Sequence, residues 1–167
     1  MGSEMKTVVI TGSTRGIGLG LAREFLQRGH QVIVSGTSEQ SVANALEQLK
    51  GLGDMIGQPC RVEDYEAVQN LWNKGFERFG KIDIWINNAG ISTSKTILDE
   101  LALDEIHNTV DTNLIGSILC TKIAAKEMLK QGFGQIYMFE GFGSNGQLQN
   151  GITVYGSTKR ALRYFTA

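Results

Sequence analysis

Two side chains near the C-terminal end of the sequence have the types and spacing of an acid–base pair. Tyr155 and Lys159 are four residues apart in a stretch that is predicted to be helical from Val154 onward, so both side chains project from one face. An isolated phenol has a pKa of about 10 and exchanges protons poorly at neutral pH. A neighbouring ammonium favours the phenolate and lowers that pKa. We therefore predict that Tyr155 donates a proton, although surface helices of many proteins carry Tyr and Lys at this spacing.

A glycine-rich stretch near the other end has the pattern of a phosphate-binding turn. It lies between an apolar run, Val8 to Ile10, and a stretch with helical periodicity, Leu19 to Arg28, which predicts a strand, a turn and a helix. Its glycines permit a tight exit from the strand, close approach of a pyrophosphate and close helix packing, while free N–H groups and the helix dipole face the anion. An ordinary sharp turn is the alternative. The predicted dinucleotide contacts are Gly12, Ser13, Thr14, Arg15, Gly16, Ile17 and Gly18.

A second polar segment follows a predicted buried strand, Lys81 to Ile86. It reads Asn87-Asn88-Ala89-Gly90 and falls where ligands bind in open parallel sheets, at the carboxyl ends of the strands. We predict that Asn88, Ala89 and Gly90 contact the cofactor. A plain turn of the Asn-Gly type is the alternative on these four residues alone.

The end of the second predicted strand, Gln31 to Ser35, indicates which dinucleotide binds. A carboxylate at this place binds the ribose 2′-hydroxyl of NAD, whereas NADP needs room and positive charge for a 2′-phosphate. At the end of this strand the sequence runs Ser35-Gly36-Thr37-Ser38 with no carboxylate before Glu39, and Arg15 lies in the glycine turn. The sequence therefore favours NADP(H) over NAD(H), with Ser35 and Thr37 beside the cofactor. The alternative role for Arg15 is that of a solvated loop cation.

Strand and helix patterns alternate along the rest of the chain. Helices are expected over 38–50, 63–79 and 99–131, and strands over 54–60 and 134–139. The connections are long enough for right-handed crossovers, so the pattern predicts an α/β fold with a doubly wound parallel sheet covered by helices on both faces. A single domain is expected over 5–167. The Gly-rich segment 140–151 is expected to be a mobile loop beside the active site.

Composition and charge narrow the classes of function. The chain has 167 residues, 41% of them hydrophobic, which is enough to bury a core. Its net charge of -1 supports neither a nucleic-acid nor a membrane partner, and no apolar run reaches the roughly 18 residues that span a bilayer. Cys60 and Cys120 are expected to be reduced thiols in a cytosolic core, and the isolated His30 and His107 predict no metal site. Residues 1–4 look like an expression remnant.

Four motifs together resemble the short-chain dehydrogenase/reductase family: the glycine turn, the Asn87–Gly90 segment, Asn113 in the long helical region, and Tyr155 with Lys159. The resemblance runs from Lys6 to the chain end and implies a Rossmann-type fold that binds a nicotinamide dinucleotide. It implies that Tyr155 exchanges a proton with a carbonyl or alcohol, aided by the positive charge of the oxidised nicotinamide. It also implies that Lys159 hydrogen-bonds the nicotinamide ribose and that Asn113 holds a water in a proton relay.

The sequence departs from this family where a serine usually binds the substrate carbonyl. That serine lies about thirteen residues before the tyrosine, and the register gives Phe142, between Gly141 and Gly143. Ser144 is the nearest hydroxyl and is our candidate catalytic residue, with backbone N–H groups of the glycines as the alternative. The stretch from Tyr137 to Lys159 looks like the chlorophyll b reductase branch, which also lacks the serine in its usual register. This likeness suggests a bulky carbonyl substrate.

Two further departures concern the adenine site and the length of the chain. Arg61 replaces an acidic residue that often meets the adenine amine, which leaves the backbone of Arg61 and Val62 for that contact. Family members are usually longer, whereas this chain stops at Ala167 inside the helix of Tyr155. We therefore expect a truncated domain that lacks the C-terminal strands and exposes an apolar sheet edge.

These observations predict an NADP(H)-dependent oxidoreductase that acts on a small-molecule carbonyl or alcohol. A non-catalytic dinucleotide-binding or redox-sensing module is the alternative, because the serine is displaced and the C-terminus is short. By resemblance, the helices over 100–131 and from Val154 are expected to pair with their copies in a homodimer or homotetramer. A cytoplasmic location is also expected.

Overall fold

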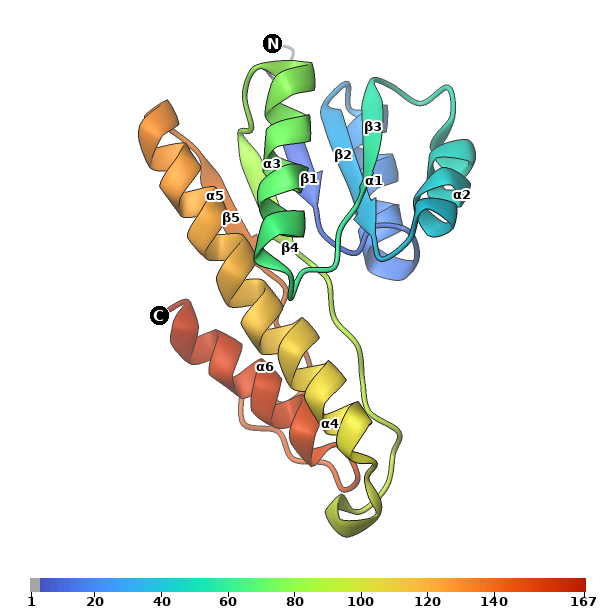
Figure 1. Ribbon diagram of the computed structural model, residues 1–167, viewed down its shortest axis with the longest axis vertical. Helices are drawn as coiled ribbons and strands as arrows, with labels where there is room; N and C mark the ends of the chain where they lie inside the picture. Colours follow the sequence, from blue (N-terminus) through green and yellow to red (C-terminus); the bar gives the residue numbers. More distant parts are fainter. Residues whose placement is uncertain (1–3) are drawn as a thin grey trace.

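The computed structural model describes residues 4–167, which form one five-stranded parallel sheet with helices on both faces (Figure 1). The strands lie in the order β3-β2-β1-β4-β5, so the chain starts in the middle of the sheet and builds outward to each edge. This topology confirms the predicted doubly wound Rossmann-type fold, and it places the topological switch between β1 and β4. The elements are β1 (Thr7–Ile10), α1 (Gly16–Gln27), β2 (Gln31–Gly36), α2 (Glu39–Leu49), β3 (Met55–Pro59), α3 (Tyr65–Phe79), β4 (Ile84–Asn87), η1 (Leu98–Glu100), α4 (Leu103–Val110), η2 (Asp111–Gly116), α5 (Ser117–Gln131), β5 (Gln135–Met138) and α6 (Thr153–Phe165).

Each face of the sheet carries its own hydrophobic core because successive side chains of a strand point to opposite faces. In β1, Val8 and Ile10 pack with apolar residues of α1 and α2, whereas Val9 packs with those of α3 and α5. The indoles of Trp72 and Trp85 stack in the second core, with ring centroids 6.0 Å apart. The apolar periodicity of these segments thus predicted the helical layers on the two faces of the sheet.

Helix boundaries follow the capping chemistry of the sequence. The Ser38 hydroxyl accepts a hydrogen bond from the backbone N–H of Ser41, and the Asp64 carboxylate accepts from two N–H groups of α3. Gly80 ends α3 in the left-handed conformation. Helix α1 begins at Gly16, three residues before the predicted start, because the glycine turn itself leads into the first helical turn.

The long helical region predicted over 99–131 forms a nearly continuous rod of α4, the π-helical segment η2 and α5. Asn113 and Gly116 lie in the π-helical segment, where a Cβ on Gly116 would lie only 3.0 Å from Cβ of Val62. Glycine therefore permits the rod to pack tightly on the segment after β3. The π turn also turns Asn113 inward, where its side chain is fully buried.

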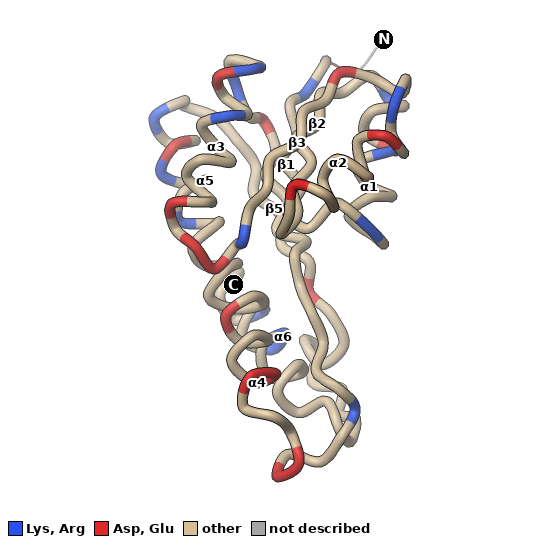
Figure 2. The backbone as a smooth tube through the Cα atoms, turned by 45° about the vertical axis from the view of Figure 1, so that its right-hand side comes forward, with Lys and Arg blue, Asp and Glu red and all other residues tan. Residues whose placement is uncertain are grey.

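Helices α4 and α6 and the connections beside them project beyond the carboxyl ends of the strands (Figure 1). Positive and negative residues are interspersed along the outer helices (Figure 2). β5 is an edge strand paired only with β4, and its Tyr137 is half exposed. Within residues 4–167, the helices fall short of the length and apolarity needed to cross a membrane. Of the suspected expression remnant, residues 1–3 lie outside the described residues.

Candidate active site

The glycine turn joins β1 to α1 at the switch point of the sheet. Gly12 has a φ of 62°, and a Cβ there would lie 2.8 Å from Cα of Ala89. Gly18 is equally confined, because its Cβ would lie 2.6 Å from the carbonyl oxygen of Gly12. Gly16 has a φ of 55° and open space where a Cβ would stand, which leaves room for a ligand against the backbone. Gly12 and Gly18 are therefore confined by neighbouring backbone, whereas Gly16 is open, and the approach of a pyrophosphate to Gly16 stays a prediction.

Hydrogen bonds lock this turn to the segment after β4. The Thr11 hydroxyl accepts from the backbone N–H groups of Asn88 and Ala89, at 3.0 Å each. The Asn88 amide donates to the carbonyl oxygens of Thr11 and Gly12, at 2.9 and 3.1 Å. The two motifs thus form one unit, and Thr11 is a positioning residue that the sequence analysis missed. The signal in the sequence was a hydroxyl residue, Thr11, directly after a predicted strand and directly before the glycine turn.

Ser13 and Ser35 form a buried junction between β1 and β2. The Ser13 N–H donates to the carbonyl oxygen of Ser35 at 2.7 Å, and the Ser13 hydroxyl accepts from the Ser35 N–H at 2.9 Å. Neither residue is exposed to solvent. Their hydrogen bonds therefore join the glycine turn to the end of β2, and neither residue lines the cleft between the sheet and α6.

A cleft of about 1070 Å³ runs along the carboxyl edge of the sheet to α6. Most predicted site residues line it: Gly12, Thr14, Arg15, Gly16, Ile17, Gly18, Thr37, Arg61, Val62, Asn88, Ala89, Gly90, Tyr155 and Lys159. Ser13, Ser35, Asn113 and Ser144 are outside the lining. The lining residues that the sequence analysis did not propose as site residues are Ser41, Asn44, Gln48, Cys60, Glu63, Ile91, Ser92, Asn108, Thr112, Phe139, Glu140 and Ile152. The helical spacing of polar residues 41, 44 and 48 was a usable signal for part of this wall.

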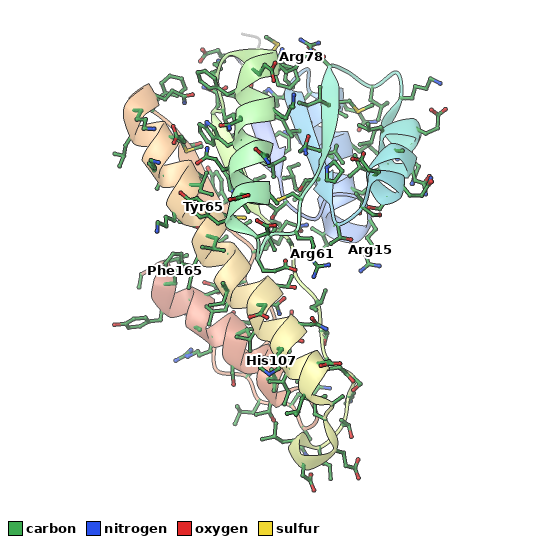
Figure 3. The ribbon with its side chains drawn as sticks, viewed as in Figure 1. Arg15, Arg61, Tyr65, Arg78, His107 and Phe165 are labelled. Carbon is green, nitrogen blue, oxygen red and sulfur yellow. The ribbon has the colours of Figure 1, made fainter. Side chains whose placement is uncertain are left out.

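Two arginines stand at the sheet end of the cleft. Arg15 projects from the glycine turn and Arg61 from the segment after β3, both at the lower edge of the sheet in the view (Figure 3). The Arg61 guanidinium lies 2.6 Å from the Glu63 carboxylate, while Arg15 forms no ion pair with any residue in the described part of the chain. A Cβ at Gly36 would overlap the Thr14 methyl group, so the end of β2 packs directly against the glycine turn. Arg15 and Thr37 therefore belong to one end of the cleft.

Tyr155 and Lys159 form the other end of the cleft. The Lys159 ammonium lies 5.7 Å from the centre of the Tyr155 ring and donates to the carbonyl oxygen of Phe139 at 3.3 Å. Burial lowers the pKa of Lys159, because desolvation disfavours its charge. Burial likewise raises the pKa of Tyr155. The lowering of the phenol pKa that the sequence analysis predicts is therefore not found, because desolvation raises this pKa.

Asn113 connects α6 to the segment that follows Gly90. Its side-chain oxygen accepts from the N–H of Ile91 at 2.8 Å, and its amide donates to the carbonyl oxygen of Ile91 at 2.9 Å. The same amide donates to the Thr158 hydroxyl at 3.2 Å, which donates to the carbonyl oxygen of Tyr155 at 2.7 Å. Asn113 therefore holds the cleft wall in place, and its relay role stays a prediction.

The loop after β5 places glycine, not serine, against the phenol. A Cβ built on Gly141 would overlap the Tyr155 hydroxyl. Phe142 lines a separate groove beside α6, and the buried Ser144 is outside the Tyr155 cleft. The catalytic role of Ser144 stays a prediction. Among the described residues, no group of three His, Cys, Asp or Glu side chains is arranged to hold a metal ion.

Comparisons with known proteins agree with this arrangement. The sequence profile of the family described as short chain dehydrogenase matches residues 6–167. The chain is 42% identical over 179 residues to the probable chlorophyll(ide) b reductase NYC1 of Arabidopsis thaliana, named as chloroplastic, an alignment that covers 96% of this chain and 36% of that protein. It covers 47% of the chlorophyll(ide) b reductase NOL of the same plant. The chain thus spans less than half the length of these curated relatives, whose names confirm the likeness to the chlorophyll b reductase branch.

Solved structures show the same fold. An alcohol dehydrogenase from Thermococcus sibiricus, complexed with 5-hydroxy-NADP, is 28% identical with a TM-score of 0.87, covering 97% of this chain and 68% of that one. A short chain dehydrogenase/reductase from Burkholderia phymatum in complex with NAD has a TM-score of 0.92 at 23% identity, covering 99% of this chain and 59% of that one. With the family profile, the identity to the plant proteins and the shared fold in agreement, the chain belongs to the short chain dehydrogenase family.

Proposed function

We propose that this protein is an NADP(H)-dependent oxidoreductase that interconverts a carbonyl and an alcohol, with Tyr155 as the general acid and base. The observation that carries this proposal is the cleft itself. One cavity brings the glycine turn and the Asn88–Gly90 segment together with Tyr155 and Lys159. A dinucleotide site and a proton-transfer pair in one cleft are the two parts that hydride chemistry requires.

The residues of the cleft fit a nicotinamide dinucleotide. Gly16 leaves its backbone open to a pyrophosphate at the start of α1, and the rigid Thr11–Asn88 junction supports it. When bound, the nicotinamide supplies or accepts the hydride. Tyr155 holds the proton for the substrate oxygen, and the buried Lys159 ammonium favours the phenolate that remains afterwards.

Replacing Tyr155 by Phe tests this function. We expect kcat to fall by roughly 10²- to 10⁴-fold, because the proton donor is lost, while NADPH affinity is retained. The matched control is Tyr164→Phe, since the Tyr164 side chain is on the same helix and 88% exposed. The carbonyl panel would include chlorophyllide b, chosen from the names of the plant relatives. Equal turnover of wild type and Tyr155→Phe would contradict the proposal.

The NADP(H) preference is supported by the lack of a carboxylate at the end of β2 and by the Arg15 guanidinium, which forms no ion pair within residues 4–167. We expect Arg15→Ala to weaken NADPH binding at least 10-fold while NADH binding changes little, because only NADPH carries the 2′-phosphate. Arg28→Ala is the control for the loss of one positive charge, since Arg28 is already paired with Glu24 on α1. Equal loss of NADPH and NADH affinity in Arg15→Ala would argue against a 2′-phosphate contact.

The redox-sensing alternative finds little support in the thiols. Cys60 is 4% exposed, and burial together with the charges of Asp64 and Glu63 raises its pKa to about 12. Burial also raises the pKa of Cys120. Because the thiolate is the reactive form, both residues are poor sensors.

The self-association of this protein is a further proposal. Leu103, Ile115 and Leu129 on the α4–α5 rod and Tyr164 on α6 are more than one-third exposed. A homodimer or homotetramer formed through these helices would bury them. We expect light scattering to give at least twice the mass of one chain; a mass of one chain at all concentrations would contradict this. The cytoplasmic location stays a prediction.

A further inference from the structure

Gly141 occupies the position that faces the catalytic phenol. A Cβ built there would overlap the Tyr155 hydroxyl oxygen and would lie 3.2 Å from Cε of Lys159. The residue nearest to the place of proton transfer therefore carries no side chain. A substrate oxygen held by Tyr155 would meet the bare backbone of the loop at this point.

The side chains that follow Gly141, those of Phe142 and Ser144, do not supply a hydroxyl to the Tyr155 cleft. Phe142 lines the separate groove that includes Ile97 and Leu148. Ser144 is 7% exposed and lies outside the Tyr155 cleft, with its carbonyl oxygen accepting from the Arg160 guanidinium at 2.8 Å. The Ser144 hydroxyl, the candidate from the sequence, is therefore outside the cleft that Tyr155 lines.

The loop beside the Tyr155 hydroxyl has two backbone N–H groups with no acceptor among residues 4–167. The N–H of Ser144 donates to the carbonyl oxygen of Gly141 at 3.1 Å, and Gly143 has a φ of 96°. Phe142 at the second position has no positive φ, and a positive φ at the third residue, which Gly143 permits, is then typical of a type II turn. Such a turn leaves the N–H of its second residue without an internal partner. Within residues 4–167, the N–H groups of Gly141 and Phe142 donate no hydrogen bond.

We propose that the backbone N–H groups of Gly141 and Phe142 hold the substrate carbonyl oxygen beside Tyr155, in place of a serine hydroxyl. This inference rests on the proposed function. During reduction, the carbonyl carbon receives a hydride from the reduced nicotinamide dinucleotide, which is thereby oxidised, and the C=O π electrons move to the oxygen. The two N–H groups stabilise this oxygen until it takes the proton from the Tyr155 hydroxyl. The phenolate that remains is reprotonated from solvent.

The turn allows one donor to be deleted selectively. Proline is favoured at the second position of a type II turn and has no N–H, so Phe142→Pro removes the donor with the turn retained. Phe142→Ala removes the ring but keeps the N–H and is the matched control. Ser144→Ala removes the competing hydroxyl. We expect kcat for carbonyl reduction to be about 10²-fold lower in Phe142→Pro than in Phe142→Ala, with NADPH affinity and melting temperature unchanged, and no loss in Ser144→Ala.

A second variant keeps the test independent of proline. Replacing residue 142 by phenyllactic acid through nonsense suppression changes the amide to an ester, which lacks the N–H but keeps the ring, and it should give a comparable loss. Equal kcat in Phe142→Pro and Phe142→Ala, or a loss confined to Ser144→Ala, would overturn the inference and leave the proposed function standing. A wild-type protein that binds NADPH but reduces no carbonyl of the panel would overturn both.

Discussion

The two ends of the cleft are built by different means. At the sheet end, parallel strands and the Thr11–Asn88 hydrogen bonds hold the glycine turn from several sides. At the α6 end, the segment from Glu140 to Ile152 contains no helix or strand. Its path depends on glycines with positive φ at 143, 146 and 151, and on a hydrogen bond from Arg160 to the carbonyl oxygen of Ser144. The glycine-turn end is therefore confined by packing, whereas the Tyr155 end is shaped by turns.

Because the two ends differ in this way, replacing a glycine should have different effects on stability and on cofactor binding at each end. Where backbone packs on backbone, an added methyl group has no room, so stability and cofactor binding fall together. Where only the turn conformation requires glycine, an added methyl group strains one residue and leaves the rest in place. Five predictions test this contrast, beginning with the largest expected effect.

Gly12→Ala should be the most damaging change. It forces a positive φ on a residue with a side chain and places that side chain 2.8 Å from the Ala89 backbone. We expect a loss of at least about 2 kcal/mol in the free energy of unfolding, with no measurable NADPH binding. Urea unfolding and fluorescence titration measure the two effects.

Gly16→Ala is the matched comparison for Gly12→Ala. Gly16 also has a positive φ, but the space beside it is open. We expect a stability loss of about 1 kcal/mol, while NADPH binding is lost because the methyl group blocks the pyrophosphate. Undiminished NADPH binding by Gly16→Ala would show that the dinucleotide does not approach this backbone.

Thr11→Val should weaken the same end of the cleft by removing an acceptor. The N–H of Ala89 loses its acceptor and the N–H of Asn88 keeps only its hydrogen bond to the carbonyl oxygen of Ile86, which costs about 1–3 kcal/mol in the free energy of unfolding. NADPH affinity should fall as well, because the two motifs are no longer joined. Thr11→Ser keeps the hydroxyl and should remain close to wild type. A Val variant as stable as the Ser variant would mean that these hydrogen bonds contribute little.

The contrast between packing and turns also explains which parts of the site could be predicted from the sequence. The strands, the helices, the parallel sheet and the glycine turn follow from local periodicity and from glycine patterns. Ser13 and Ser35 were misplaced in the cleft, because strand pairing buries their hydroxyls in a backbone junction. The register of the catalytic loop could not be predicted. A type II turn, which no spacing rule reveals, brings Gly141 to the phenol while it turns Phe142 into the groove.

The pKa of the Cys60 thiol depends on how completely the sheet end of the cleft buries this side chain. Its pKa is raised from 9.0 to about 12, first by burial, so the folded thiol stays protonated at pH values where the unfolded thiol ionises. The contribution of Cys60 to stability is therefore complete below pH 9 and is lost as the pH rises toward 12. We expect a Cys60→Ala variant to lose less stability than wild type between pH 8 and pH 10.5 in urea unfolding. Parallel losses in both proteins would indicate that the thiol is not held in a closed site.

Gly146→Ala should have the smallest effect and is the counterpart of Gly12→Ala in the loop. Gly146 has a φ of 90°, but the nearest atom to an added Cβ is the Arg160 guanidinium nitrogen at 3.8 Å. Only the backbone conformation is strained, so we expect a stability loss of about 1 kcal/mol, with NADPH affinity equal to wild type. The same urea and fluorescence measurements apply. If Gly146→Ala abolished NADPH binding, the loop and the sheet end would be coupled, and the division of the cleft into a packed end and a turn-shaped end would have to be abandoned.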